Sequence, residues 1–179
     1  KKNRINSAAN DMKNIFLTGP PGVGKTTIIK NVLAYLKTPA GGFYTQEIRQ
    51  AGVRVGFEIL TLKGEKAPLA HVNVKSPYKV GNYGVVLETI DRVAVTSLKN
   101  ALQENNLIVI DEIGKMELFS EEFKKVVISC LDSDKIVLGT VTEAKLPFAE
   151  EVSKRDDLHL IYLSAKNRNQ VAEDLNEAI

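Results

Sequence analysis

This chain of 179 residues is 44% hydrophobic and carries a formal net charge of +2, from 24 basic and 22 acidic side chains. Its length and apolar content suit one globular domain with a substantial core. Its balanced charge excludes the strong field typical of proteins that bind nucleic acids or membrane surfaces. The single cysteine, Cys130, excludes an internal disulfide and favours a reducing, cytoplasmic compartment. Its helical spacing from Phe123, Val126 and Val127 predicts a core residue rather than a reactive thiol.

The N-terminal segment lacks the apolar stretch of a signal peptide. Met12 directly precedes the first strand-like run, so we interpret Met12 as the native start and residues 1–11 as a non-native extension. No apolar run approaches the ~20 residues that span a bilayer. We therefore expect one domain over residues 12–179, with no membrane segment.

The first half of the chain begins with a strand and a helix and then turns to strands alone. Asn14–Leu17 is a short apolar run typical of a strand, and residues 28–36 repeat apolar side chains at helical spacing. Between Gly42 and Val72, β-branched and aromatic residues alternate with polar ones, which predicts antiparallel strands. Turns between these strands are predicted at Gly52 and at Lys63-Gly64, and a loop is predicted over Ser76–Gly84.

The second half returns to alternating helices and strands. Helical spacing covers residues 86–102, and Leu107–Ile110 is a wholly apolar run that indicates a strand buried on both faces. Ser120 is a predicted helix N-cap, with Glu121 and Glu122 in the positive first turn. The remaining predictions are strands at Ile136–Leu138 and Leu158–Leu163, a short helix starting near Pro147, and a last helix with Asn167 and Gln170 as its capping box.

The order of these elements predicts an α/β fold. Strands that alternate with helices form a mainly parallel sheet with helices on both faces. Because the Gly42–Val72 stretch interrupts that alternation, we expect an antiparallel addition at one edge of the sheet.

The first chemical motif follows the first predicted strand and opens the first predicted helix. It reads Gly19-Pro20-Pro21-Gly22-Val23-Gly24-Lys25-Thr26 and fits the P-loop pattern G-x-x-x-x-G-K-[ST] at every fixed position. Its glycines permit close backbone approach, so that successive N–H groups form a nest for phosphate oxygens at the positive end of a helix. Lys25 is expected to reach the β- and γ-phosphates, and the Thr26 hydroxyl to bind Mg²⁺.

The second motif is a pair of acids, Asp111 and Glu112, directly after the buried strand Leu107–Ile110. The carboxyl end of a parallel strand opens on the ligand crevice of an α/β fold. We assign Asp111 to the Mg²⁺ side and Glu112 to the attacking water, which it orients or deprotonates. Lys25 and Glu112 are therefore the predicted catalytic residues, and Thr26 and Asp111 the predicted metal ligands.

Further polar residues are weaker candidates. Lys115 follows the two acids, and Glu117 is the next candidate for the base after Glu112. Thr140 and Thr142 end the strand expected beside the P-loop strand, where one of them can sense the γ-phosphate. None of the candidate arginines lies in a diagnostic motif; they are Arg49, Arg54, Arg92, Arg155 and Arg168.

With both motifs identified, the chain resembles the THEP-type nucleoside triphosphatase family from Met12 onward. This family has a human cancer-related nucleoside triphosphatase among its relatives. The matching segments are Gly19–Thr26, Gly42–Thr45 with Glu47 and Arg49, Gly56-Phe57, Val80-Gly81 with Tyr83 and Val85, Asp111–Leu118, and Asn167-Arg168. The run Asp111–Leu118 is the specific part, because many families share the P-loop.

The resemblance implies a three-layer P-loop NTPase core, RecA-like or nucleotide-kinase-like. It also implies hydrolysis of the terminal phosphate of several nucleotides, ATP and GTP included. It assigns no role to Thr45, Glu47, Arg49 or Arg168. The nucleotide contacts expected from the motifs and the resemblance are Gly19, Pro20, Pro21, Gly22, Val23, Gly24, Lys25, Thr26, Thr27, Leu107, Ile108, Val109, Ile110, Asp111, Glu112, Ile113 and Gly114.

The leading hypothesis is a monomer that hydrolyses nucleoside triphosphates with Mg²⁺, to diphosphate and phosphate, at low base selectivity. The alternative is a nucleoside or nucleotide kinase, because this core often hosts phosphoryl transfer. Glu112 after Asp111 favours water as acceptor, and no Arg-rich lid is evident, although Ser76–Gly84 has the length of a small lid. A third hypothesis is a slow switch that needs a partner's arginine; near-neutral charge argues against nucleic acid as that partner.

Overall fold

The computed structural model describes residues 13–179. The predicted extension over residues 1–11 and the start at Met12 lie outside the described residues. The strands are β1 (Asn14–Thr18), β2 (Ala40–Gln50), β3 (Val53–Thr61), β4 (Lys66–His71), β5 (Lys79–Val80), β6 (Tyr83–Val85), β7 (Leu107–Ile113), β8 (Ile136–Val141) and β9 (Leu158–Tyr162). The helices are α1 (Lys25–Leu36), α2 (Leu87–Thr89), the π-helical η2 (Ile90–Ala94), α3 (Val95–Glu104), the 3-10 turn η3 (Glu117–Phe119), α4 (Glu121–Leu131), α5 (Pro147–Ser153) and α6 (Arg168–Ala178).

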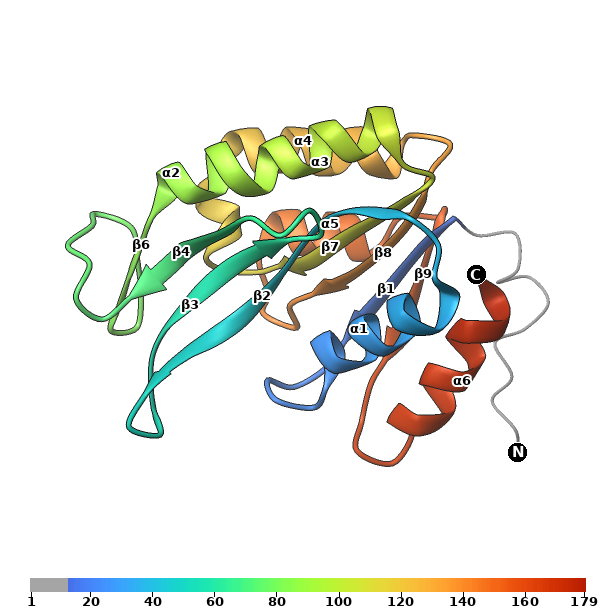
Figure 1. Cartoon of the computed structure of the whole chain (residues 1–179), viewed down its shortest axis with the longest axis horizontal. Coiled ribbons are helices and arrows are strands. Elements are labelled where there is room, and N and C mark those ends of the chain that lie inside the picture. The colour runs from blue at the N-terminus through green and yellow to red at the C-terminus, as the bar shows by residue number, and fades with distance from the viewer. Residues whose placement is uncertain (1–12) are drawn as a thin grey trace.

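The described strands form one mixed sheet in the order β5-β6-β4-β3-β2-β7-β8-β1-β9. Its central part, β2-β7-β8-β1-β9, is parallel. Helices α1 and α6 cover one face of the sheet, and α3, α4 and α5 cover the other (Figure 1). This three-layer arrangement confirms the predicted α/β fold.

The buried strand β7 lies at the centre of the core. Ile108 and Ile110 face the layer of α3, α4 and α5, whereas Leu107 and Val109 face α1 and α6. Each of these side chains is at most 1% exposed, as the apolar run predicted. Cys130, on α4, is buried in the layer between the sheet and α3, α4 and α5, and burial raises the pKa of its thiol to about 12. The predicted core role of Cys130 is confirmed.

The predicted antiparallel addition is confirmed, since the antiparallel pairing of β2 with β3 begins at Phe43. The preceding residues Ala40–Phe43 pair in parallel with Leu107–Ile110, so the first part of β2 also belongs to the parallel core. The predicted loop Ser76–Gly84 is partly wrong. It contains the short antiparallel pair β5 and β6, since the turn at Gly81, with φ of 56°, lets Val80 face Tyr83.

Three other local predictions fall on helix termini. The Ser120 side chain accepts a hydrogen bond from the Phe123 N–H at 3.0 Å, and Pro147 occupies the first turn of α5; both predictions are confirmed. The capping box of α6 is wrong, because Asn167 makes no side-chain cap bond. Its amide instead closes the loop before the helix, accepting from Ser164 N at 2.7 Å and donating to Tyr162 O at 2.8 Å.

At Gly42, strand β2 leaves no room for a side chain against β7. Gly42 has φ of 102°, and a Cβ at this position would overlap the carbonyl oxygen of Val109. Gly64 has a similar φ of 93°, but a Cβ there would meet nothing within 4 Å. Alanine at Gly64 would therefore cause backbone strain without a steric clash. We expect Gly42→Ala to lower the free energy of unfolding by about 1–3 kcal/mol more than Gly64→Ala, measured by urea titration. Equal losses in the two variants would contradict the close approach.

None of the helices within residues 13–179 is both long and apolar enough to cross a bilayer.

Candidate active site

The P-loop connects β1 to α1 at the carboxyl edge of the parallel sheet (Figure 1). Gly22 and Gly24 have φ of 78° and 107°, which other residues rarely adopt, and a Cβ at either position would meet nothing within 4 Å. No side chain within residues 13–179 caps the N-terminus of α1, and the first turn of this helix holds no acidic residue. Its free N–H groups and positive dipole end therefore remain available to an anion.

Lys25 reaches back over the loop. Its Nζ donates to the carbonyl oxygen of Gly19 at 2.6 Å and to that of Pro20 at 3.5 Å. An ammonium group held by neutral carbonyls can move to a phosphate at little cost, since the phosphate oxygens are stronger acceptors.

Thr26 and Asp111 bring the two sequence motifs together. The Thr26 hydroxyl donates to Asp111 Oδ2 at 2.6 Å, across 85 residues of sequence. The Thr140 hydroxyl donates to Asp111 Oδ1, also at 2.6 Å. Burial raises the pKa of Asp111, which is 2% exposed, while the two hydroxyl donors and the charge of Lys25 act in the opposite direction. Thr140 therefore orients Asp111, and Thr142, directly after β8, lines the cavity described below.

The residues present fit a magnesium ion. A hydroxyl and a carboxylate oxygen are the ligand types that Mg²⁺ prefers, and it usually keeps several waters beside one or two carboxylates and substrate phosphates. Within residues 13–179 no group of three or more His, Cys, Asp or Glu side chains is arranged to hold a metal. Thr26 and Asp111 would therefore hold the ion only together with phosphate and water oxygens.

Two further acids lie beside Asp111. A Cβ placed on Gly114 would lie 2.6 Å from Glu112 Oε1 and 3.0 Å from Glu117 Oε2, so both carboxyl groups converge on that glycine. Burial raises the pKa of Glu112; the charge of Lys25 lowers it and that of Asp111 raises it. Burial, followed by the charge of Glu112, raises the pKa of Glu117 well above its usual range. Of the two, Glu112 is the more accessible, because Glu117 is only 4% exposed.

A cavity of about 930 Å³ joins these groups. Its lining includes the P-loop residues Gly19, Pro21, Gly22, Gly24, Lys25, Thr26 and Thr27 and the acids Asp111, Glu112 and Glu117. Lys115 and Thr142 also line it. The predicted contacts Leu107, Ile108, Val109, Ile110 and Ile113 are not brought to it, because their side chains are packed in the core. Pro20, Val23 and Gly114 are not among its lining residues either.

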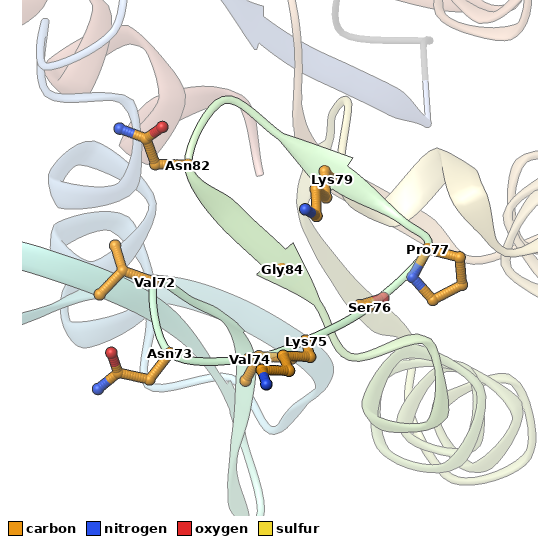
Figure 2. A pocket seen from close by; sticks show the side chains of 9 residues that line it. All are labelled: Val72, Asn73, Val74, Lys75, Ser76, Pro77, Lys79, Asn82 and Gly84. Atoms are coloured by element: carbon orange, nitrogen blue, oxygen red, sulfur yellow. The ribbon is translucent and has the colours of Figure 1, made fainter.

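A second hollow, of about 830 Å³, lies at the segment between β4 and β6 (Figure 2). Among the residues that the structure describes, its charged lining residues are Lys75 and Lys79, and no acid or histidine lines it. The hydroxyl of Ser76 donates to the Val85 carbonyl oxygen at 2.8 Å. The described lining therefore offers no nucleophile paired with a base and none of the residues predicted from the two motifs.

Sequence reasoning missed the far wall of the first cavity. Glu47, Arg54, Phe57, Leu69, Val80 and Tyr83 line it from β2, β3, β4, β5 and β6. The resemblance had marked Glu47, Phe57, Val80 and Tyr83 without a role, and Arg54 was one of five candidate arginines. The other four, Arg49, Arg92, Arg155 and Arg168, do not line this cavity.

Known proteins resemble this chain over 90% of its length. A family model described as NTPase matches residues 14–176. The nucleoside-triphosphatase THEP1 of Thermotoga sp. (strain RQ2) is 47% identical over 161 residues, which cover 90% of this chain and 92% of that protein. The crystal structure of THEP1 from Aquifex aeolicus matches with a TM-score of 0.84 at 36% identity, covering 90% of this chain and 96% of that chain. The solution structure of a human cancer-related nucleoside triphosphatase matches with a TM-score of 0.77 at 40% identity, covering 90% and 94%.

Proposed function

This chain belongs to the NTPase family, as the sequence resemblance indicated, and we propose that it hydrolyses nucleoside triphosphates to diphosphate and phosphate with Mg²⁺. The observation that carries this proposal is the 2.6 Å contact between Thr26 and Asp111. It places a hydroxyl and a carboxylate, both suited to Mg²⁺, directly beside the free N-terminus of α1. Relatives named nucleoside-triphosphatases support hydrolysis in general.

In the proposed mechanism the backbone N–H groups of Gly22 to Thr26 and the ammonium group of Lys25 bind the β- and γ-phosphates. When bound, Mg²⁺ would offset charge on the β- and γ-phosphate oxygens. Thr140 keeps Asp111 oriented toward Thr26. These groups hold the phosphate chain in place before any bond breaks, which is where this class of enzyme gains most of its rate.

Glu112 is the group proposed to act on water. Its carboxylate accepts a hydrogen bond from the water and orients it in line with the bond to be broken. The water oxygen forms a bond to the γ-phosphorus, the bond from that phosphorus to the bridging oxygen breaks, and the bridging oxygen leaves on the diphosphate. The proton of the water passes to Glu112 or to the released phosphate. The raised pKa of Glu112 suits this role, because a general base is most effective when its pKa lies near the operating pH.

A phosphate-release assay with Mg²⁺–ATP alone tests this proposal against the kinase alternative. That alternative gains support from the apolar side chains of Phe57, Leu69 and Val80 in the cavity wall, which would suit a small acceptor molecule. A hydrolase releases phosphate without an added acceptor and depends on Mg²⁺, so that EDTA abolishes the reaction. Release that stays at background until a nucleoside or nucleotide is added would favour the kinase instead.

The switch hypothesis is tested in the same assay by adding RNA or DNA. Under the proposed function these additions change turnover by less than a few-fold. A stimulation by orders of magnitude would favour a switch that depends on a partner.

We expect poor selectivity for the base. Strong discrimination requires buried polar groups that match one base edge, and the chain has no Asn-Lys-x-Asp guanine-reading motif. In the loop after β9, the amide of Asn167 is already bonded to the backbone of Ser164 and Tyr162. The kcat/KM values for ATP, GTP, CTP and UTP should therefore differ by less than about 100-fold, measured by phosphate release. A preference of about ten thousand-fold for one base would contradict this expectation.

A further inference from the structure

Arg54, near the start of β3, lines the same cavity as Lys25 and Glu112. Beyond its parallel pairing with β7, which ends at Phe43, β2 continues to Gln50 and then turns into β3. The β2–β3 hairpin therefore projects from the edge of the sheet where the P-loop follows β1 (Figure 1). This topology brings an arginine from the antiparallel addition to the cavity that holds the phosphate site.

The guanidinium group of Arg54 is held by residues of three strands. Its Nε donates to the hydroxyl of Tyr83 at 2.9 Å, and its Nη1 donates to Glu47 Oε1 at 3.2 Å. Its central carbon lies 5.1 Å from the ring centroid of Phe57 and 5.7 Å from that of Tyr83. These two rings pack edge to face, with centroids 5.2 Å apart. These contacts hold the Arg54 side chain in one orientation, although it is 44% exposed.

These contacts leave one end of the guanidinium group free. Within residues 13–179, Arg54 Nη2 has no hydrogen-bond partner. A planar guanidinium group has five N–H donors in a fixed fork, which suits phosphate oxygens. Arg49, in the same hairpin, also bonds Glu47, but its Nη2 is occupied by that contact and its Nη1 donates to the Gly52 carbonyl oxygen. Arg49 does not line the cavity.

We propose that Arg54 is a catalytic arginine supplied by the chain itself, with Nη2 bound to a γ-phosphate oxygen while the bond to the leaving diphosphate breaks. Tyr83 and Glu47 are positioning residues that aim its guanidinium group. The inference rests on the hydrolysis proposed above. Negative charge spreads over the transferred phosphoryl group in the transition state, and an arginine that meets this charge raises kcat by about 10³–10⁵-fold in enzymes of this chemistry.

The test compares Arg54→Gln and Arg54→Lys with the matched control Arg49→Gln. We expect Arg54→Gln to lower kcat by about 100-fold or more while KM for Mg²⁺–ATP changes by only a few-fold. Arg54→Lys should recover only part of this loss, because an ammonium group lacks the fork. Arg49→Gln should keep kcat within a few-fold of the wild-type value, because Arg49 binds Glu47 Oε2, whereas Arg54 donates to Oε1.

A second readout separates a catalytic role from a structural one. Mg²⁺–ADP with aluminium fluoride imitates the transferred phosphoryl group, whereas Mg²⁺–ADP alone does not. Arg54→Gln should weaken binding of the fluoride complex by about the same factor as kcat and leave ADP affinity within a few-fold. Tyr83→Phe keeps the ring and removes the hydroxyl, so it should lower kcat by about 10-fold with the same selective loss of the fluoride complex. That loss should disappear in the Arg54→Gln background.

Wild-type kcat in Arg54→Gln would overturn the inference. Equal weakening of ADP and of the fluoride complex would also overturn it, because it would show a binding or structural role. Failure of the proposed function itself looks different. In that case the wild-type protein releases no phosphate from Mg²⁺–ATP, whatever residue is at position 54.

Discussion

Glu112→Gln is expected to lower kcat by about two orders of magnitude or more and to leave the affinity for Mg²⁺–ATP within a few-fold. The glutamine keeps the shape of the side chain and a hydrogen-bonding group but cannot take a proton. Water is a weak nucleophile, and help from a general base contributes typically ~10²–10⁴-fold. Single-turnover hydrolysis beside equilibrium nucleotide binding measures the two quantities separately.

Glu117→Gln is the matched control for this experiment. Glu117 converges on Gly114 with Glu112, but it is almost fully buried, and its pKa lies well above the usual carboxyl range. Because a carboxyl group this deeply buried is less accessible to a water molecule than that of Glu112, this variant should keep turnover within a few-fold of the wild-type rate. Full turnover in Glu112→Gln together with loss in Glu117→Gln would transfer the proposed role to Glu117.

Lys25→Ala is expected to weaken ATP binding by roughly 10- to 100-fold. A hydrogen bond to a charged group is worth ~1.5–3 kcal/mol, and the ammonium group of Lys25 already lies over the loop, on the carbonyl oxygens of Gly19 and Pro20. Calorimetric titration of the wild-type and variant proteins with Mg²⁺–ATP measures the difference.

Lys30→Ala is the control for this substitution. Lys30 belongs to the same helix, but its ammonium group lies over the ring of Tyr44, 4.5 Å from the centroid, and does not line the cavity. Its replacement should change ATP affinity by less than a few-fold. Equal losses in the two variants would indicate a general effect of charge rather than a specific contact of Lys25.

The sequence was sufficient to predict that the P-loop and Asp111 come together, because each belongs to a local pattern. Residues 19–26 connect strand β1 to helix α1, so the positions of Gly24 and Lys25 follow from their places in this one short segment. Asp111 likewise follows a buried apolar run whose carboxyl end must open at the same edge of a parallel sheet. The meeting of Thr26 with Asp111 follows from these two local patterns and the fold class.

The opposite wall was not predictable in the same way, because it depends on strand register. Arg54 reaches Glu47 and Tyr83 through the pairing of β2 with β3, β3 with β4, and β4 with β6. Irregularities between Ile48 and Arg49 and between Phe57 and Glu58 shift this register. A shift of one residue moves each side chain to the other face of the sheet, so alternation alone does not reveal which residues line the cavity.

The most direct test of the account is a structure of the protein with Mg²⁺ and a non-hydrolysable ATP analogue. We expect the β- and γ-phosphates at the backbone N–H groups of Gly22 to Thr26, with Lys25 moved from the carbonyls to the phosphates. We expect Mg²⁺ on the Thr26 hydroxyl beside Asp111, and Glu112 on the far side of the γ-phosphate. A nucleotide bound elsewhere, or a triphosphate in the P-loop with Glu112 turned away from the γ-phosphate, would contradict the account.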